Sequence, residues 1–340
     1  MVKKIKHYLR WTIILLAGLI IFGLLSVWLT KKDVYPAEQL SYGLTFSPMV
    51  LRDMGLDWRA AFLETLDDLA VKRLRLVAYW PMVEPTKDTY DFTDLDWQIN
   101  QASQRGAQVI LAVGARLPRW PECHYPQWYS SENEPERQQQ LLAYLQEVIE
   151  RYDHNPTITA WQIENEPFLM GFGECPKLNT KLLDQEIALA RSLTKKPIII
   201  TDSGELSIWL PAAKRADIFG TSIYRYTYSK TLRQYITYPM TPSFFRIKTK
   251  LTELFTKTKN IIVIEMQAEP WGRKAYFTLS QAERDRTMNM AKLQDTLEFG
   301  RQGGFQTFYL WGLEWWYWEK QINNNPTYWQ FMKNLFAQSL

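Results

Sequence analysis

The chain has 340 residues, of which 46% are hydrophobic and 22% are charged, a balance typical of a folded protein with a large buried core. Residues 1–32 hold six basic side chains and no acidic one, which leaves 34 basic and 36 acidic groups in the rest. That near-neutral remainder argues against a nucleic-acid-binding surface. The three histidines are not spaced with other ligands, so neither a histidine metal site nor a Ser-His-Asp triad is indicated, and we expect no metal and no cofactor.

The N-terminal segment has the pattern of a membrane anchor. Residues 11–30 carry no charge and are long enough for a helix that crosses a bilayer. The basic tail, residues 1–10, favours a cytoplasmic N-terminus, with the rest of the chain on the extracytoplasmic side of the cell membrane. A cleaved signal peptide is the alternative, although Ser26-Val27-Trp28 is a poor cleavage site. Residues 31–39 are interpreted as a linker.

From residue 40 to residue 340, strand-like and helix-like segments alternate without a long linker, which predicts a single domain. Eight segments have strand patterns: residues 41–46, 74–79, 108–113, 158–163, 197–201, 217–224, 260–265 and 305–311. Eight have helical patterns: residues 57–70, 94–104, 131–152, 181–193, 207–214, a segment from about 243, 280–300 and 327–338. Strands such as residues 109–113 are apolar throughout, as parallel strands buried on both faces are. The fold class predicted is α/β, a (β/α)₈ TIM barrel preceded by one transmembrane helix.

Polar residues close several of these strands. Asn165, Glu166 and a proline follow the fourth strand, and Glu265 closes the seventh. In a (β/α)₈ barrel the carboxyl ends of the strands carry the active site, and a pair of carboxylates there suggests glycosidic-bond chemistry. Arg75 lies within the second strand, where it either faces outward or holds a catalytic carboxylate ionised.

These residues resemble the signature of clan A, the retaining glycoside hydrolases built on the (β/α)₈ barrel, which includes families 5, 10, 39 and 42. The signature is Asn-Glu-Pro after strand four, here Asn165-Glu166-Pro167, with a glutamate at the end of strand seven, here Glu265. The stretch from Tyr79 to Pro85 is similar to the corresponding region of families 42 and 10. The resemblance covers residues 40–340, and the exact family is not assigned.

The resemblance implies a role for each of these residues. Glu166 would act as general acid and then general base, and Glu265 as nucleophile. Asn165 would bind the sugar 2-hydroxyl, and Arg75 would lie beneath the nucleophile. Two aromatic residues complete this set: Tyr224 at the end of strand six would hydrogen-bond Glu265, and Trp311 at the end of strand eight would form the floor of the subsite.

Other residues near the strand ends compete for roles. Glu164 lies two residues before Glu166 and is interpreted as structural. Glu269 is a candidate to bind a sugar hydroxyl or to support its loop. Trp80, Trp120 and Trp271 are candidates to stack against sugar rings, although packing within the loops is the alternative for each.

Cys123 and Cys175 fall in loops after successive strands. An extracytoplasmic domain permits a disulfide between them, and two separate thiols fit the sequence equally well.

The function predicted is that of a membrane-anchored retaining O-glycosyl hydrolase, or a transglycosylase. It would cleave a β-linked extracellular or cell-envelope glycan by double displacement, with an oligo- or polysaccharide as partner. The alternative is a barrel that binds glycan without cleaving it, or an envelope scaffold protein.

Overall fold

The computed structural model describes residues 18, 23, 35–131 and 133–338. The predicted basic tail and nearly all of the predicted anchor, residues 11–30, lie outside these residues. Within the described part of the chain, no helix is long and apolar enough to cross a membrane.

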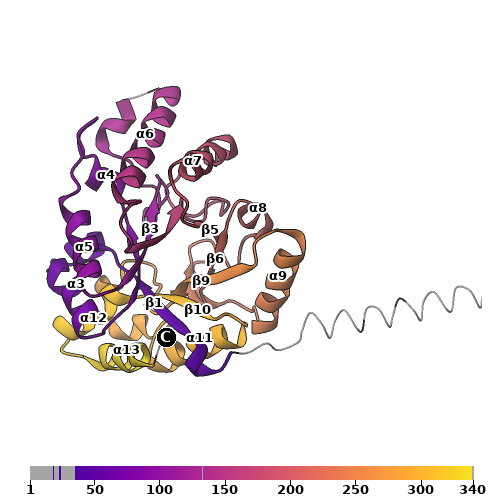
Figure 1. Cartoon of the computed structure of the whole chain (residues 1–340). Helices are drawn as coiled ribbons and strands as arrows, with labels where there is room; N and C mark the ends of the chain where they lie inside the picture. Colours follow the sequence, from indigo (N-terminus) through magenta and orange to yellow (C-terminus); the bar gives the residue numbers. More distant parts are fainter. Residues whose placement is uncertain (1–17, 19–22, 24–34, 132, 339–340) are drawn as a thin grey trace, which may run out of the picture.

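Eight parallel strands close into a barrel, which confirms the predicted (β/α)₈ architecture (Figure 1). Around the barrel the order is β1, β10, β9, β6, β5, β4, β3 and β2, so neighbours along the chain lie side by side. The strands are β1 (Ser41–Thr45), β2 (Arg73–Val77), β3 (Gln108–Val113), β4 (Ile158–Ile163), β5 (Ile198–Asp202), β6 (Ile218–Ile223), β9 (Asn260–Gln267) and β10 (Thr307–Trp311).

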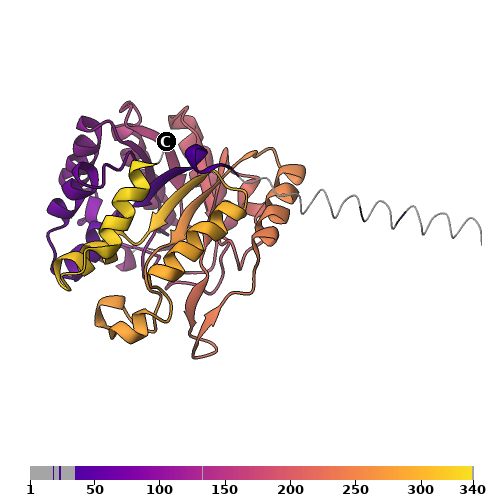
Figure 2. The same ribbon diagram turned by 90° about the horizontal axis from the view of Figure 1, so that it is seen from below.

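Helices cover the outside of the barrel, as both views show (Figures 1 and 2). They are α2 (Pro48–Asp53), α3 (Trp58–Asp67), α4 (Trp80–Val83), α5 (Thr93–Gln104), α6 (Glu134–Tyr152), α7 (Thr180–Leu193), α8 (Leu210–Ala213), α9 (Pro242–Phe255), α10 (Gln281–Arg284), α11 (Met290–Gln302), α12 (Leu313–Gln321) and α13 (Thr327–Ala337). Several begin at a side-chain cap of the expected kind: Asp57, for example, accepts from the amides of Arg59 and Ala60 at the start of α3.

Three parts of this arrangement were not expected from the sequence. The connection after β6 forms an antiparallel hairpin, β7 (Tyr226–Ser229) and β8 (Gln234–Thr237), which projects from one end of the barrel in Figure 2. The single helix predicted over residues 280–300 is two helices, α10 and α11. The segment after β10 forms the additional helix α12, which is almost wholly buried and rich in tryptophan.

Strand alternation assigns the side chains to the two faces of the barrel wall. Ile110, Ala160, Ile199, Ile264 and Tyr309 pack together as one buried cluster inside the barrel. Their neighbours along the strands belong to the larger cluster between the strands and the helices. Since these faces alternate with a period of two residues, any polar residue on the inner face must find its partners inside the barrel.

Regular alternation breaks at the two strands that carry the predicted carboxylates. In β9 the pairing with β6 skips Ile264, because Thr221 pairs with Val263 and the next residue, Ser222, pairs with Glu265. Such a bulge re-aims the side chains that follow it. After β4 the backbone takes the left-handed conformation at Glu164 (φ 57°) and again at Glu166 (φ 43°). Both irregularities lie at the carboxyl end of the barrel.

The turn after β3 lies against this strained segment. Gly114 has φ 144°, and a Cβ placed there would lie 2.5 Å from Oε1 of Glu164. Gly106, at the end of α5, also has positive φ (65°), but no atom lies within 4 Å of its Cβ position. Glycine is therefore needed at position 114 both for its positive φ and because Glu164 leaves no room for a Cβ atom. At position 106 it is needed only for its positive φ.

We expect Gly114→Ala to destabilise the fold by on the order of 3 kcal/mol or more, because strain and steric overlap add. The matched control, Gly106→Ala, should cost about 1 kcal/mol through the left-handed backbone alone. Urea denaturation of the two variants measures the difference. Equal losses would show that the approach of Glu164 to residue 114 is not a constraint.

Candidate active site

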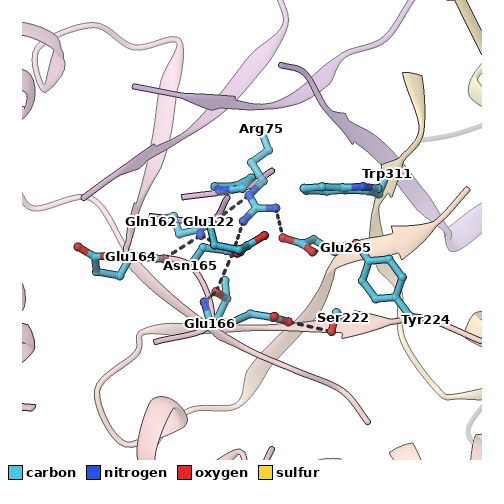
Figure 3. Close-up of polar contacts among 12 residues, drawn as sticks. Arg75, Glu122, Gln162, Glu164, Asn165, Glu166, Ser222, Tyr224, Glu265 and Trp311 are labelled. Atoms are coloured by element: carbon cyan, nitrogen blue, oxygen red, sulfur yellow. Dashed lines mark hydrogen bonds and ion pairs between the residues drawn. The ribbon is translucent and has the colours of Figure 1, made fainter. Parts of the chain in front are cut away.

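Arg75 occupies the centre of a polar cluster inside the barrel. Its side chain is fully buried, and three of its nitrogens donate hydrogen bonds of 2.7 Å: Nε to Gln162, Nη1 to Glu265 and Nη2 to Asn165 (Figure 3). The outward-facing alternative for Arg75 is therefore excluded. Because the guanidinium fork is rigid, these bonds fix Gln162 in β4, Asn165 just after β4 and Glu265 in β9 relative to one another.

Glu265 lies between a cation and a phenol. Its Oε1 is ion-paired with Arg75, and its Oε2 accepts a hydrogen bond of 3.1 Å from the hydroxyl of Tyr224. The Glu265 residue as a whole is only 4% exposed. Both oxygens of the Glu265 carboxyl group are therefore held by direct contacts.

Glu166 lies in the opposite electrostatic environment. The hydroxyl of Ser222 donates to its Oε1 at 2.9 Å, and Thr201 accepts from its backbone amide at 2.8 Å (Figure 3). Burial, and after it the negative charge of Glu265, hold the pKa of Glu166 well above its usual range. One rim of the barrel thus presents an ion-paired carboxylate and a carboxyl group that retains its proton.

Glu122 is a third buried carboxyl group of this cluster, and it was not among the residues predicted for the site. Its Oε2 accepts a hydrogen bond of 3.2 Å from Nδ2 of Asn165, whose Oδ1 is held by Arg75. Burial, and then the charge of Glu265, raise the pKa of Glu122 to about 8. The amide of Asn165 is therefore fixed at both ends, and Glu122 is protonated at neutral pH.

Glu164 points away from this cluster despite its place two residues before Glu166 (Figure 3). Its carboxylate accepts hydrogen bonds from the backbone amides of Ala115, at 2.8 Å, and Arg116, at 2.5 Å. The left-handed backbone at Glu164 turns it beneath the loop after β3. The structural interpretation of Glu164 fits these contacts.

Trp311 and Glu269 belong to a second buried network beside the first. Glu269 accepts from Nε1 of Trp311 at 2.8 Å and is ion-paired with Arg119, whose guanidinium lies 4.1 Å from the centre of the Trp311 ring. Arg119 also forms an ion pair with Glu314. Of the two alternatives for Glu269, its contacts match support of the loop, and they hold the indole of Trp311 in place.

The remaining tryptophans differ in exposure. Trp80 is fully buried, and its indole nitrogen donates a hydrogen bond to Glu84. The prediction that it stacks against a sugar is therefore corrected: its ring stacks on Tyr144 of α6. Trp271 lies edge-on to Tyr224 with its ring centre 5.1 Å away, and Phe172 packs beside it. Trp120 is 50% exposed, at the outer edge of this aromatic group.

Four partners in these networks were missed from the sequence: Glu122, Arg119, Ser222 and Gln162. Gln162 had a usable signal, because a polar residue lies there in an otherwise apolar strand, in step with Ala160 on the inner face. Glu122 and Arg119 lie in the loop after β3, where no periodicity indicates side-chain direction. Cys123 in the loop after β3 and Cys175 in the loop after β4 form a disulfide, which settles the alternative left open by the sequence.

No group of three or more histidine, cysteine, aspartate or glutamate side chains among the described residues is arranged to hold a metal ion.

Comparison with known proteins gives a consistent picture. A family model described as beta-galactosidase, Glyco_hydro_42, matches residues 62–180, which include Arg75, Asn165 and Glu166. A beta-galactosidase from Clostridium cellulovorans is 25% identical over 166 residues, covering 43% of this chain and 25% of the relative. The chain therefore spans about a quarter of that relative's length.

Solved structures show the same fold at low identity. An exo-beta-1,4-mannosidase from Opitutaceae bacterium strain TAV5 aligns with a TM-score of 0.60 at 13% identity, covering 91% of this chain and 62% of that one. A beta-galactosidase from Rahnella sp. R3 also gives 0.60, at 12% identity, covering 91% and 57%. With the family match, these findings confirm the resemblance to clan A glycoside hydrolases.

The raised pKa of Glu122 predicts a pH-dependent stability. A carboxyl group that binds its proton more tightly when folded loses stabilisation as pH rises from 4.5 towards 8. Glu122→Gln keeps the shape and the acceptor for Asn165 but does not titrate. We expect the variant to gain on the order of 1–4 kcal/mol relative to the parent between pH 5 and pH 8. Urea unfolding at both values measures this gain, and parallel pH profiles would contradict it.

Proposed function

Taking the resemblance to clan A glycosyl hydrolases as the premise, we propose that this chain is a retaining glycoside hydrolase with Glu166 as acid/base and Glu265 as nucleophile. One observation carries the proposal: two carboxyl groups on one rim lie in opposite environments, Glu265 paired with Arg75 and Glu166 buried without a cation. Divergent environments of this kind separate a proton donor from a nucleophile.

The first step breaks the glycosidic bond. A carboxylate oxygen of Glu265 attacks the anomeric carbon while the carboxyl group of Glu166 gives its proton to the departing oxygen. The bonding pair leaves with that oxygen, and a glycosyl ester of Glu265 forms. Arg75 and Tyr224 hold the attacking carboxylate in position, since both contact it directly.

The second step regenerates the enzyme. Glu166, now ionised, removes a proton from a water molecule, whose oxygen attacks the anomeric carbon and displaces the carboxylate of Glu265. Two inversions give net retention of the β configuration. The hydrogen bond from Ser222 restrains the Glu166 side chain in both protonation states.

The substrate would contact the groups around these carboxyls. Asn165 Nδ2 and the neighbouring Glu122 are placed to bind the 2-hydroxyl together, and the Trp311 indole to face the apolar side of the ring. Trp271 and the exposed Trp120 lie farther out and would contact the next sugar unit. The names of the similar proteins make β-galactosides and β-mannosides the first substrates to test.

We expect Glu265→Gln and Glu166→Gln each to lower hydrolysis of a β-linked disaccharide by about 10³-fold or more, because each removes an obligatory group. With an aryl glycoside, whose leaving group needs little protonation, Glu166→Gln should lose much less in the first step than Glu265→Gln. Rates of hydrolysis of both substrates by each variant, with the anomer of the product determined by NMR, test the roles of Glu166 and Glu265. The control is Glu147→Gln, an exposed glutamate of α6.

Full activity in Glu265→Gln, or a product of inverted configuration, would contradict the proposal. Both variants must melt at the same temperature as the parent, which shows that a lower activity does not result from unfolding.

Membrane anchoring is a second part of the proposal, and its main support is the sequence of residues 11–30. Residues 11–30 would hold the chain in the cell membrane with the barrel on the extracytoplasmic side. The disulfide between Cys123 and Cys175 supports that location, because such bonds persist in oxidising compartments.

We expect the full chain to remain with membranes after alkaline carbonate extraction, and a chain from residue 36 onward to be released. Protease should degrade the barrel when it can reach the extracytoplasmic face of the cell membrane, without disruption of that membrane. Release of the full chain by carbonate would contradict an integral anchor.

A further inference from the structure

A cavity lies outside the catalytic cluster. It occupies about 870 Å³ between the first turns of α6 and α7 and the loops that follow β3 and β4. These two helices are neighbours on the same side of the barrel in Figure 1. Glu164 lines the cavity, whereas Asn165 and Glu166, the next two residues, do not. The cavity therefore meets the β4 turn on the side opposite to the catalytic groups.

A pair of buried carboxyl groups forms one wall of this cavity. Glu164 and Glu186 are 7% and 3% exposed. Burial raises the pKa of both carboxyl groups, and the negative charge of Glu164 raises the pKa of Glu186 further. The oxygens of Glu164 also accept from the amides of Ala115 and Arg116. Oε2 of Glu186, by contrast, has no hydrogen-bond partner.

A hydrogen-bond donor without a partner belongs to the same wall. Arg116 uses its two Nη atoms to bond the carbonyls of Leu169, at 3.0 Å, and Phe172, at 3.2 Å, and its Nε is buried and unpartnered. A buried donor and a buried acceptor are thus both unsatisfied, which is costly unless water or a ligand bonds them.

The charges indicate what kind of ligand fits. Burial raises the pKa of both carboxyl groups, which opposes their ionisation, and the guanidinium of Arg116 belongs to the same lining. A hydroxyl group both donates and accepts, so hydroxyl-bearing molecules match this wall better than a cation or an anion does. The stacked rings of Tyr125 and Tyr129, with centres 4.3 Å apart, and the side chain of Leu182 add apolar surface. The volume lies within the usual range for small-molecule sites.

We propose that this cavity is a second, non-catalytic carbohydrate site that binds one or two neutral hexose units, with Glu186 as acceptor and Arg116 as donor. It goes beyond the proposed hydrolysis, because none of the groups that would break the glycosidic bond lines it.

The test uses the full chain in detergent with the Glu265→Gln change, so that sugars are not consumed. Calorimetric titration with β-1,4-galactobiose and β-1,4-mannobiose should give two sites per chain for at least one of them. Leu182→Trp, which fills the cavity, and Glu186→Leu, which removes the acceptor, should each weaken one site by about tenfold or more and leave the other unchanged. Glu147→Gln, at an exposed position of the neighbouring helix α6, is the control.

A single site, two sites that neither variant affects, or no binding at millimolar sugar would overturn the proposal. Glucosamine offered beside glucose tests the charge argument: binding of the amine alone would also overturn a neutral-sugar site. Leu182→Trp in the otherwise unchanged chain should hydrolyse an aryl glycoside at the parental rate. Failure of the cavity proposal is thereby distinguishable from failure of the proposed hydrolysis, which the Glu265→Gln kinetics decide.

Discussion

The buried guanidinium of Arg75 is the interaction on which the catalytic end of the barrel depends. A cation with no exposed surface is tolerated only where its donors are satisfied and its charge is balanced. Arg75 meets both conditions through Gln162, Asn165 and Glu265, each at 2.7 Å. The same bonds tie the end of β4 to β9, so the contacts that balance the buried charge of Arg75 also hold Glu265 in place.

The carboxyl groups around Arg75 differ in their chemistry because the backbone that carries them is irregular. The bulge in β9 turns Glu265 towards Arg75, where continued alternation would have turned it to the helices. The left-handed residues after β4 send Glu164 and Glu166 in different directions. Strain of this kind persists only where surrounding contacts over-determine it, and here Gly114, Thr201 and Arg75 supply those contacts.

The β4 turn consequently has two chemically distinct sides. On the inner side, Asn165 and Glu166 face the ion-paired cluster, and Glu122 adds a protonated carboxyl group. On the outer side, Glu164 and Glu186 line the cavity beside α6 and α7, and burial raises the pKa of both carboxyl groups. The loop that carries Glu122 and Cys123, joined to the β4 loop by the disulfide to Cys175, separates the two sides.

The sequence by itself determined the number of βα units and the strand on which each main residue lies, Glu166 after β4 and Glu265 in β9. These features can be recognised in the sequence because hydrophobic periodicity, and polar residues at the carboxyl ends of strands, are visible within short stretches of chain. Only the tertiary structure decided which way Glu164 points, that Trp80 is packed rather than open, and that Glu122 and Arg119 join the site. Those outcomes depend on a bulge, two left-handed residues and an aperiodic loop, whose side-chain directions are set by partners far away in the sequence.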